Sequence, residues 1–206
     1  MKVNVKDSLY KSEKKKRLER DFFMTDALEL ARKLIGKVLV HETPLGVVRG
    51  MITDTEAYMG VEDKGSHTYM GKRTKRTEPM FHIGGTSYVY LIYGMYSCVN
   101  ITAGDVDVPM AVLIRGVEPY DEESRKIMER LRGMERADRH LADGPGKLCI
   151  AMHISREDND IDLVTDDKFY LTEGISVEEE QIMPGKRIGI DYAQEAADYL
   201  WRFTLI

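Results

Sequence analysis

The residues that could do chemistry first gather in the stretch TDTEAYMG, residues 53 to 60. On a strand, Asp54, Glu56 and Tyr58 project from the same face, because strand side chains repeat every two residues. Two carboxylates this close raise at least one pKa, which suits a general base that works near neutral pH. Such a polar face is costly to bury unless its members are paired or functional. The alternative is the solvated outer face of an edge strand, and the motif alone leaves both interpretations open.

An arginine and a histidine extend this set. Arg115 is a charge inside the otherwise apolar stretch AVLIRGV, and a buried arginine needs a carboxylate partner. Glu56 or Asp54 on a neighbouring strand would serve, and an arginine–glutamate pair can also hold a water molecule. Snorkelling of the arginine to the surface is the alternative. His67 follows Tyr58 in a loop, and a lone histidine is a weak signal that is more often structural than catalytic.

Aromatic residues dominate the stretch YVYLIYGMY, residues 88 to 96, which holds four of the eleven tyrosines. Tyr88 and Tyr90 share one face of a strand, whereas Tyr93 falls on the other face or beyond the strand end. Gly94 permits the positive φ of a turn, so Tyr93 is predicted at a hairpin tip and outside the core. Exposed rings near basic residues stack on nucleobases, at about 1–3 kcal/mol per base, or wedge between base pairs.

The return strand of this hairpin carries Asn100, whose amide could read the edge of a base. The alternative for the whole segment is a tyrosine-rich hairpin that packs on the core. That alternative explains Tyr88 well and Tyr93 poorly.

Helices and hairpins must position these groups. Helical spacing of apolar residues begins after Thr25, a candidate cap, and stops at Gly36. A hairpin with strands over 37–42 and 47–58 follows, and then a long loop over 60–85. Beyond the loop the pattern predicts, in order, the tyrosine hairpin, a strand over 109–117, a charged helix over 122–138, a short helix with Pro145 in its first turn, and closing strands in RIGID and WRFTLI.

Hairpins outnumber βαβ units, and no repeat or linker divides the chain. We therefore predict an α+β fold with a largely antiparallel sheet. Residues 21–206 are expected to form one domain. Residues 1–20 are expected to be a basic N-terminal arm, either mobile or used for an interaction.

Composition limits the class of protein. With 206 residues and a hydrophobic share of 43%, the chain has the size and composition of a soluble globular domain. No run approaches the roughly 18 apolar residues that a membrane helix needs, and the N-terminus lacks the apolar centre of a signal peptide. A cytoplasmic protein is expected. Cys98 and Cys149 are interpreted as small buried hydrophobes, and the sequence contains no metal-site motif.

The net charge of −5 argues against a generic nucleic-acid binder, but its distribution is uneven. Residues 11–20 carry six Lys or Arg against two Glu. The stretch GKRTKRT, residues 71–77, carries four basic residues and no acid. Acidic residues concentrate in residues 156–180. The second basic run stands between two chemically rich segments, which makes it the more informative one.

Several blocks of the chain together resemble a known family. In order, they are DFF with ALELARKLIGKVLV, TEAYMGVEDKGSH, YVYLIYGMYSCVNI, AVLIRGVEP and DGPGKLC. They are similar to the blocks of the alkyladenine DNA glycosylase family, the vertebrate-type 3-methyladenine DNA glycosylases. The resemblance runs from about residue 21 to 155 and continues more weakly to the end. It implies a single mixed domain with a curved antiparallel sheet, a hairpin that inserts into DNA, and peripheral helices.

The resemblance also implies roles for individual residues. Glu56 would be the general base that activates water, and Arg115 would help to hold that water. The walls of a pocket for a flipped base would be formed by Tyr58, His67 and Tyr90. Tyr93 would intercalate in place of the extruded nucleotide. Asn100 would crowd the exocyclic amine of undamaged guanine at the pocket floor.

The partner implied is double-stranded DNA that contains damaged purines, processed by a monomer without metal or cofactor. The acidic net charge then requires a local basic face, expected from Lys72, Arg73, Lys75, Arg76 and Lys147. The substrate range is left open among 3-methyladenine, 7-methylguanine, hypoxanthine and ethenoadenine. Two alternatives compete: a module that binds lesions without cutting, and a metal-dependent nuclease with Asp54 and Glu56 as ligands.

Overall fold

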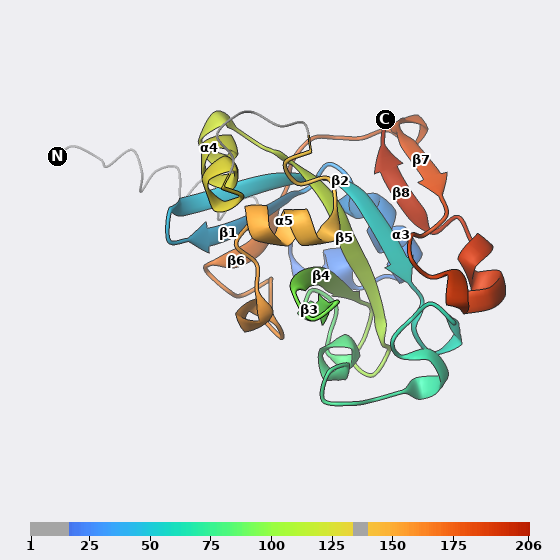
Figure 1. The fold of residues 1–206 in the computed structure, drawn as a ribbon. Coiled ribbons are helices and arrows are strands. Elements are labelled where there is room, and N and C mark those ends of the chain that lie inside the picture. Colours follow the sequence, from blue (N-terminus) through green and yellow to red (C-terminus); the bar gives the residue numbers. More distant parts are fainter. Residues whose placement is uncertain (1–16, 134–139) are drawn as a thin grey trace.

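The computed structural model describes residues 17–133 and 140–206. Its strands form one sheet in which every pairing is antiparallel, with the order β3-β4-β5-β2-β1-β6. In addition, β8 pairs with β2, and β7 pairs with β8. Figure 1 shows the sheet curling through a single mixed domain, as predicted. The strands are β1 (Val38–Thr43), β2 (Gly46–Tyr58), β3 (Ser87–Ile92), β4 (Tyr96–Ala103), β5 (Met110–Pro119), β6 (Phe169–Thr172), β7 (Ile182–Gly185) and β8 (Arg202–Leu205).

Short helices surround the sheet. Of these, α3 packs on β2 and β5, α5 packs on β4 and β5, and α4 packs on β2. The α-helices are α2 (Arg20–Phe23), α3 (Ala27–Leu34), α4 (Glu122–Leu131) and α5 (Pro145–Ala151). The 3₁₀ helices are η1 (Gly60–Glu62), η2 (Tyr69–Gly71), η3 (Glu78–Phe81), η4 (Arg156–Asp158), η5 (Glu179–Gln181) and η6 (Asp191–Asp198).

The strand β2 organises the sheet around the candidate site. Its first half pairs with β1, and its second half pairs with β8 on that side, while β5 runs along the other side. The pairing with β5 is irregular around Asp54, which is typical of a bulge that re-aims side chains. The edge-strand alternative for residues 53–58 is therefore wrong, because β2 has partners on both sides.

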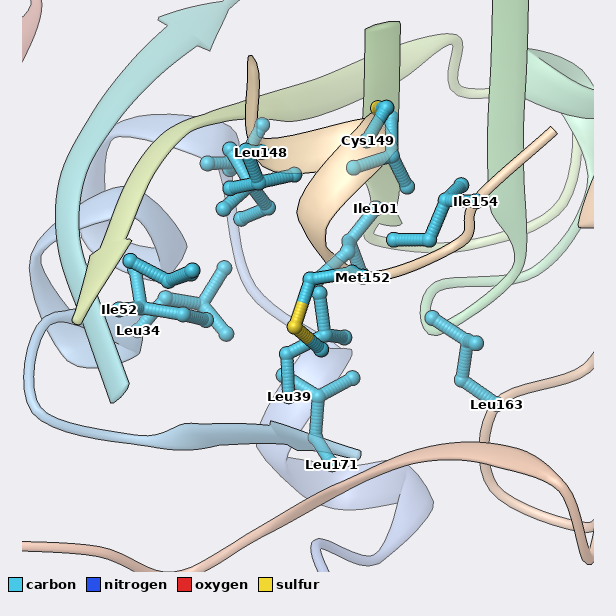
Figure 2. Packing of buried hydrophobic residues seen from close by; sticks show 14 of the residues in the cluster. Leu34, Leu39, Ile52, Ile101, Leu148, Cys149, Met152, Ile154, Leu163 and Leu171 are labelled. Carbon is cyan, nitrogen blue, oxygen red and sulfur yellow. The ribbon is translucent and has the colours of Figure 1, made fainter. Parts of the chain in front are cut away.

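One hydrophobic cluster joins these layers. Leu34 of α3, Ile52 of β2 and Ile101 of β4 belong to it, together with Leu148 and Met152 from α5 and its end. Figure 2 shows these side chains gathered between the helices and the strands. Cys98 and Cys149 are buried free thiols, as predicted. Among the described residues, no helix is both long and apolar enough to cross a membrane.

Two predicted helix ends differ from the structure: the cap of α3 lies one residue later, and α4 ends before residue 138. The N-cap of α3 is Asp26, whose carboxylate accepts from the Glu29 N–H, and not Thr25. The helix predicted over 122–138 ends earlier, since α4 stops at Leu131 and Gly133 adopts a φ of 64°. Residues 134–138 of that prediction lie outside the described residues.

The predicted strand in RIGID, residues 187–191, is wrong. The strand β7 comes earlier in the chain, and Gly189 adopts a φ of 78°, which breaks an extended run. The Ile188 N–H is used by a side chain, because it donates to Glu56. The other closing strand is confirmed as β8.

Most of the N-terminal arm, residues 1–16, lies outside the described residues. Its last residues are held on the domain. Leu18 is buried, Arg17 lies 3.7 Å from the centre of the Tyr170 ring, and Arg20 bonds Asp162. The basic side chains of Arg17 and Arg20 are therefore in contact with the folded domain.

Candidate active site

A cavity of about 550 Å³ opens where the end of β2 meets the β3–β4 hairpin. Its wall comes from six parts of the chain: β2, the loop over 60–85, the β3–β4 hairpin, β5, the first residue of α5, and the segment after β7. The structure brings together in this wall Tyr58, His67, Tyr90, Asn100 and Arg115, with Tyr93 at the rim. Glu56 lies directly behind it, in contact with Tyr58 and Arg115.

Glu56 is fully enclosed, and both of its carboxylate oxygens are occupied. Oε2 accepts from the Tyr58 hydroxyl at 2.9 Å. Oε1 accepts from the Ile188 N–H at 2.7 Å and lies 3.2 Å from Nη1 of Arg115. No part of the Glu56 side chain is exposed to solvent. These three partners hold the Glu56 carboxylate in one orientation, which a catalytic base requires.

Burial raises the pKa of Glu56 above its ordinary value. The Arg115 charge, the Ile188 N–H and the Tyr58 hydroxyl oppose this rise, because each favours the charged form. The net direction is upward, so the Glu56 carboxylate is a stronger base than an exposed glutamate. This property suits removal of a proton from water.

Arg115 has the carboxylate partners that its position in an apolar strand predicted. Its guanidinium lies 3.2 Å from Glu56 and 3.6 Å from Asp54, and its side chain is 12% exposed. Asp54 is in turn bonded by Arg202 of β8, at 2.9 Å from Nε and 2.7 Å from Nη2. Two arginines and two carboxylates thus form a connected, partly buried network, and the snorkelling alternative for Arg115 is wrong.

Aromatic rings form one wall of the cavity. The His67 ring meets Tyr90 edge-on at 4.7 Å between centres, and Tyr90 lies 5.4 Å from Tyr88. Nδ1 of His67 is 3.0 Å from the Tyr88 hydroxyl. Asn100, opposite Tyr88 in the β3–β4 register, donates to the Tyr88 carbonyl at 3.0 Å. The wall is therefore held in one arrangement by contacts within and behind it.

The charge states of the wall are set mainly by burial. Burial lowers the pKa of His67 to about 4, helped by the positive charges of Arg76 and Lys72. His67 is consequently neutral at physiological pH. Burial also raises the pKa of both Tyr58 and Tyr90, so their hydroxyls stay protonated. The wall presents neutral aromatic faces, which favour a planar and electron-poor guest.

Tyr93 stands at the tip of the β3–β4 hairpin, as predicted. Its side chain is 85% exposed. Both Tyr93 and Gly94 have positive φ, 53° and 71°, and the Met95 N–H bonds the Ile92 carbonyl. This is the pattern of a type I′ turn, which favours Asn-Gly and disfavours a bulky first residue. The bulky, exposed Tyr93 side chain is therefore held in a backbone conformation that costs free energy.

Comparison with known proteins identifies the family. The family model for methylpurine-DNA glycosylase matches residues 21–206. The chain belongs to the methylpurine-DNA glycosylase family. The resemblance found in the sequence blocks is thereby confirmed, as is the enzyme class, a DNA glycosylase of DNA repair.

Bacterial relatives agree with this assignment. A protein of Clostridium perfringens strain SM101 is 46% identical over 197 residues, which is 92% of this chain and 95% of that protein. A protein of Clostridioides difficile strain 630 is 43% identical over 201 residues, 91% of this chain and all of that protein. Each bears the provisional name 3-methyladenine DNA glycosylase.

The basic residues expected to face DNA differ in their surroundings. Arg73 bonds Glu78 and Asp107, and Lys147 bonds Asp143. Lys72 and Lys75 are exposed. Arg76 turns toward the cavity, with its guanidinium 4.9 Å from the centre of the Tyr90 ring and 3.5 Å from Nε2 of His67.

Sequence reasoning missed three residues that the structure places around Glu56 and its neighbours. Arg202 supports Asp54, Ile188 donates to Glu56 through its backbone, and Arg187 lies behind Tyr58. The sequence features that could have pointed to these residues are Arg202 in the closing strand and Gly189 in RIGID. Neither indicates a partner more than a hundred residues away. The described residues contain no group of three or more His, Cys, Asp or Glu arranged to hold a metal.

Proposed function

We propose that this chain removes alkylated purines from duplex DNA by hydrolysing the N-glycosidic bond. The observation that carries the proposal is Glu56, a buried carboxylate with a raised pKa, behind an aromatic-walled cavity and in contact with Arg115. The chemistry needs a strong, oriented base beside a pocket for a planar ring. The family to which the chain belongs, methylpurine-DNA glycosylase, indicates the substrate class.

In the proposed reaction, a water molecule held by Glu56 and Arg115 attacks C1′ of the damaged nucleotide. Its oxygen forms the new bond, Glu56 accepts the proton, and the C1′–N bond breaks with both electrons leaving on the base. An alkylated purine carries positive charge, so it departs as a neutral base without an added proton. The products are the free base and an abasic site.

The base must first leave the duplex. Extrusion costs a few kcal/mol and least at a damaged pair, so part of the selectivity lies in the DNA. We propose that Tyr58, His67 and Tyr90 then stack on and contact the extruded base. Asn100 is proposed to reject undamaged guanine by crowding its exocyclic amine. The neutral tyrosine faces favour a cationic purine over a normal one.

Docking on DNA is proposed to use the basic residues beside the cavity. Arg73 and Lys147 would exchange their carboxylate partners for phosphates, while Lys72 and Lys75 are exposed already. Arg76 would lie at the cavity mouth, near the flipped nucleotide. One chain supplies every group in this proposal, so we propose that it acts as a monomer.

Tyr93→Ala and Tyr93→Asn should both weaken binding to lesion-containing DNA, because the ring that fills the gap in the duplex is lost. Asparagine tolerates positive φ, so Tyr93→Asn is expected to melt at or above the wild-type temperature. Affinity measured by fluorescence anisotropy and thermal melting separate the two effects. Unchanged affinity in a folded Tyr93→Asn protein would return this residue to a purely structural role.

The proposed function is tested by incubating methylated duplex DNA with the protein in EDTA and measuring free bases by chromatography. We expect 3-methyladenine and 7-methylguanine to be released without strand cleavage. Duplexes with single hypoxanthine or ethenoadenine lesions extend the panel and define the substrate range. Binding without release at any pH would indicate a lesion-binding module, and strand cleavage that EDTA abolishes would indicate a metal-dependent nuclease.

A further inference from the structure

A second ion pair lies behind the cavity and is completely enclosed. The side chains of Arg187 and Asp63 are both 0% exposed, and they form two hydrogen bonds, 2.5 Å from Nη1 to Oδ2 and 2.8 Å from Nη2 to Oδ1. A buried ion pair is weak support for stability, because removing two charges from water costs about as much as the pair returns. Its presence beside the candidate site suggests a role in geometry.

The pair ties together three separated segments. Arg187 donates to the carbonyls of Ala57 on β2, at 3.0 Å, and of Ala196 on η6, at 3.2 Å. Asp63 accepts from the Met59 and Gly65 N–H groups at 3.1 and 2.9 Å, which shapes the start of the loop that carries His67. The segment between β7 and β8, red in Figure 1, is thereby held against the end of β2.

Arg187 and the residue after it also contact two residues of the candidate site, Tyr58 and Glu56. The Arg187 guanidinium lies 4.8 Å from the centre of the Tyr58 ring and 4.8 Å from that of Trp201. The next residue, Ile188, donates its N–H to Oε1 of Glu56 at 2.7 Å. The position of Arg187 therefore determines where both the Tyr58 ring and the Ile188 N–H lie.

We propose that Arg187 and Asp63 are positioning residues for the glycosidic hydrolysis, because their ion pair holds the Ile188 N–H on Glu56 and the Tyr58 ring in the cavity wall. This inference rests on the proposed function. It assigns no contact with substrate to either residue. Arg187 acts through Tyr58 and Ile188, and Asp63 acts through Arg187 and the loop.

The consequence is a pH dependence that a purely structural pair would not have. The Ile188 N–H stabilises the charged form of Glu56, so its loss raises the pKa of that carboxyl further. Glu56 is then protonated, and inactive as a base, up to a higher pH. The acid limb of the rate profile must move upward. The other charged or titratable groups that influence Glu56 stay unchanged: Asp54 and Tyr58 on β2, Cys98 on β4, Arg115 on β5 and Arg202 on β8.

The test is the double variant Asp63→Asn/Arg187→Gln, which removes both charges and leaves neither unpaired. Release of 7-methylguanine is measured under single-turnover conditions as a function of pH. We expect the acid limb to shift to higher pH and the maximal rate to fall, by about 10²-fold if Glu56 or Tyr58 is misplaced by an ångström. Affinity for DNA with an abasic analogue should change little.

Two further variants control this result. Arg20→Gln/Asp162→Asn removes another ion pair that is joined by two hydrogen bonds and whose residues do not line the cavity. It should lower the melting temperature and leave the acid limb in place. Arg187→Lys keeps the charge but loses the planar fork, so it should show a smaller shift in the same direction.

The outcomes separate the inference from the proposed function. No release by the wild-type protein would overturn the proposed function itself. An active wild type with an unshifted acid limb in the folded double variant would overturn only the positioning role. Should the double variant fail to fold, Arg187→Lys decides, since an unshifted limb in that variant also overturns the inference.

Discussion

Glu56→Gln is expected to abolish base release while the protein stays folded and still binds lesion-containing DNA. Glutamine has the shape of glutamate, and its oxygen can still accept from the Ile188 N–H, but it cannot take a proton from water. Loss of a general base costs about 10²–10⁴-fold in rate. Single-turnover release assays on methylated DNA measure the loss, and anisotropy with an abasic-analogue duplex measures binding.

The control for this substitution is Glu118→Gln, which removes an exposed carboxylate from β5 and should leave release unchanged. Melting temperatures of both variants show whether either is unfolded. Retained turnover in Glu56→Gln would remove Glu56 as the base. Lost turnover together with lost binding would instead indicate a damaged cavity, and the role of Glu56 would need a variant that keeps binding.

Arg115→Gln should have the second largest effect, on stability and on the pH profile together. The guanidinium is the charge that most favours the ionised form of Glu56, so its removal raises the pKa of that carboxyl. The free energy of unfolding should also fall, by about 3–5 kcal/mol, because two carboxylates lose their buried cation. Denaturant unfolding measures the free energy, and single-turnover release at several pH values measures the profile.

The direction of the pH effect follows from the sign of the shift. Glu56 is active when deprotonated, so activity falls as the pH drops through its pKa. A higher pKa in Arg115→Gln moves this acid limb to higher pH. Arg202→Gln is the matched control, because the Arg202 guanidinium bonds Asp54, whereas the Arg115 guanidinium lies 3.2 Å from Glu56. It should lower stability with a smaller shift, and equal shifts in both variants would contradict a direct role for Arg115.

Local patterns in the sequence determined much of the candidate site. The two-residue strand repeat placed Asp54, Glu56 and Tyr58 so that Arg115 reaches both acids and Tyr58 bonds Glu56. The glycine after Tyr93 placed that ring at an exposed tip. These predictions succeeded because strand periodicity and turn geometry depend only on neighbours along the chain. The roles assigned by family resemblance remain predictions that the proposed experiments test.

Only the tertiary structure decided which groups surround these residues. Arg202 and Ile188 meet Asp54 and Glu56 across 148 and 132 residues of chain, and Arg187 meets Asp63 across 124. The stretch RIGID alternates and is apolar enough to predict a strand. In the structure, however, Arg187 bonds the buried Asp63, and the Ile188 N–H donates to the Glu56 side chain. The pKa of Glu56 depends on this burial and on these distant donors. No local pattern encodes them, because long-range contacts form only when the whole sheet closes.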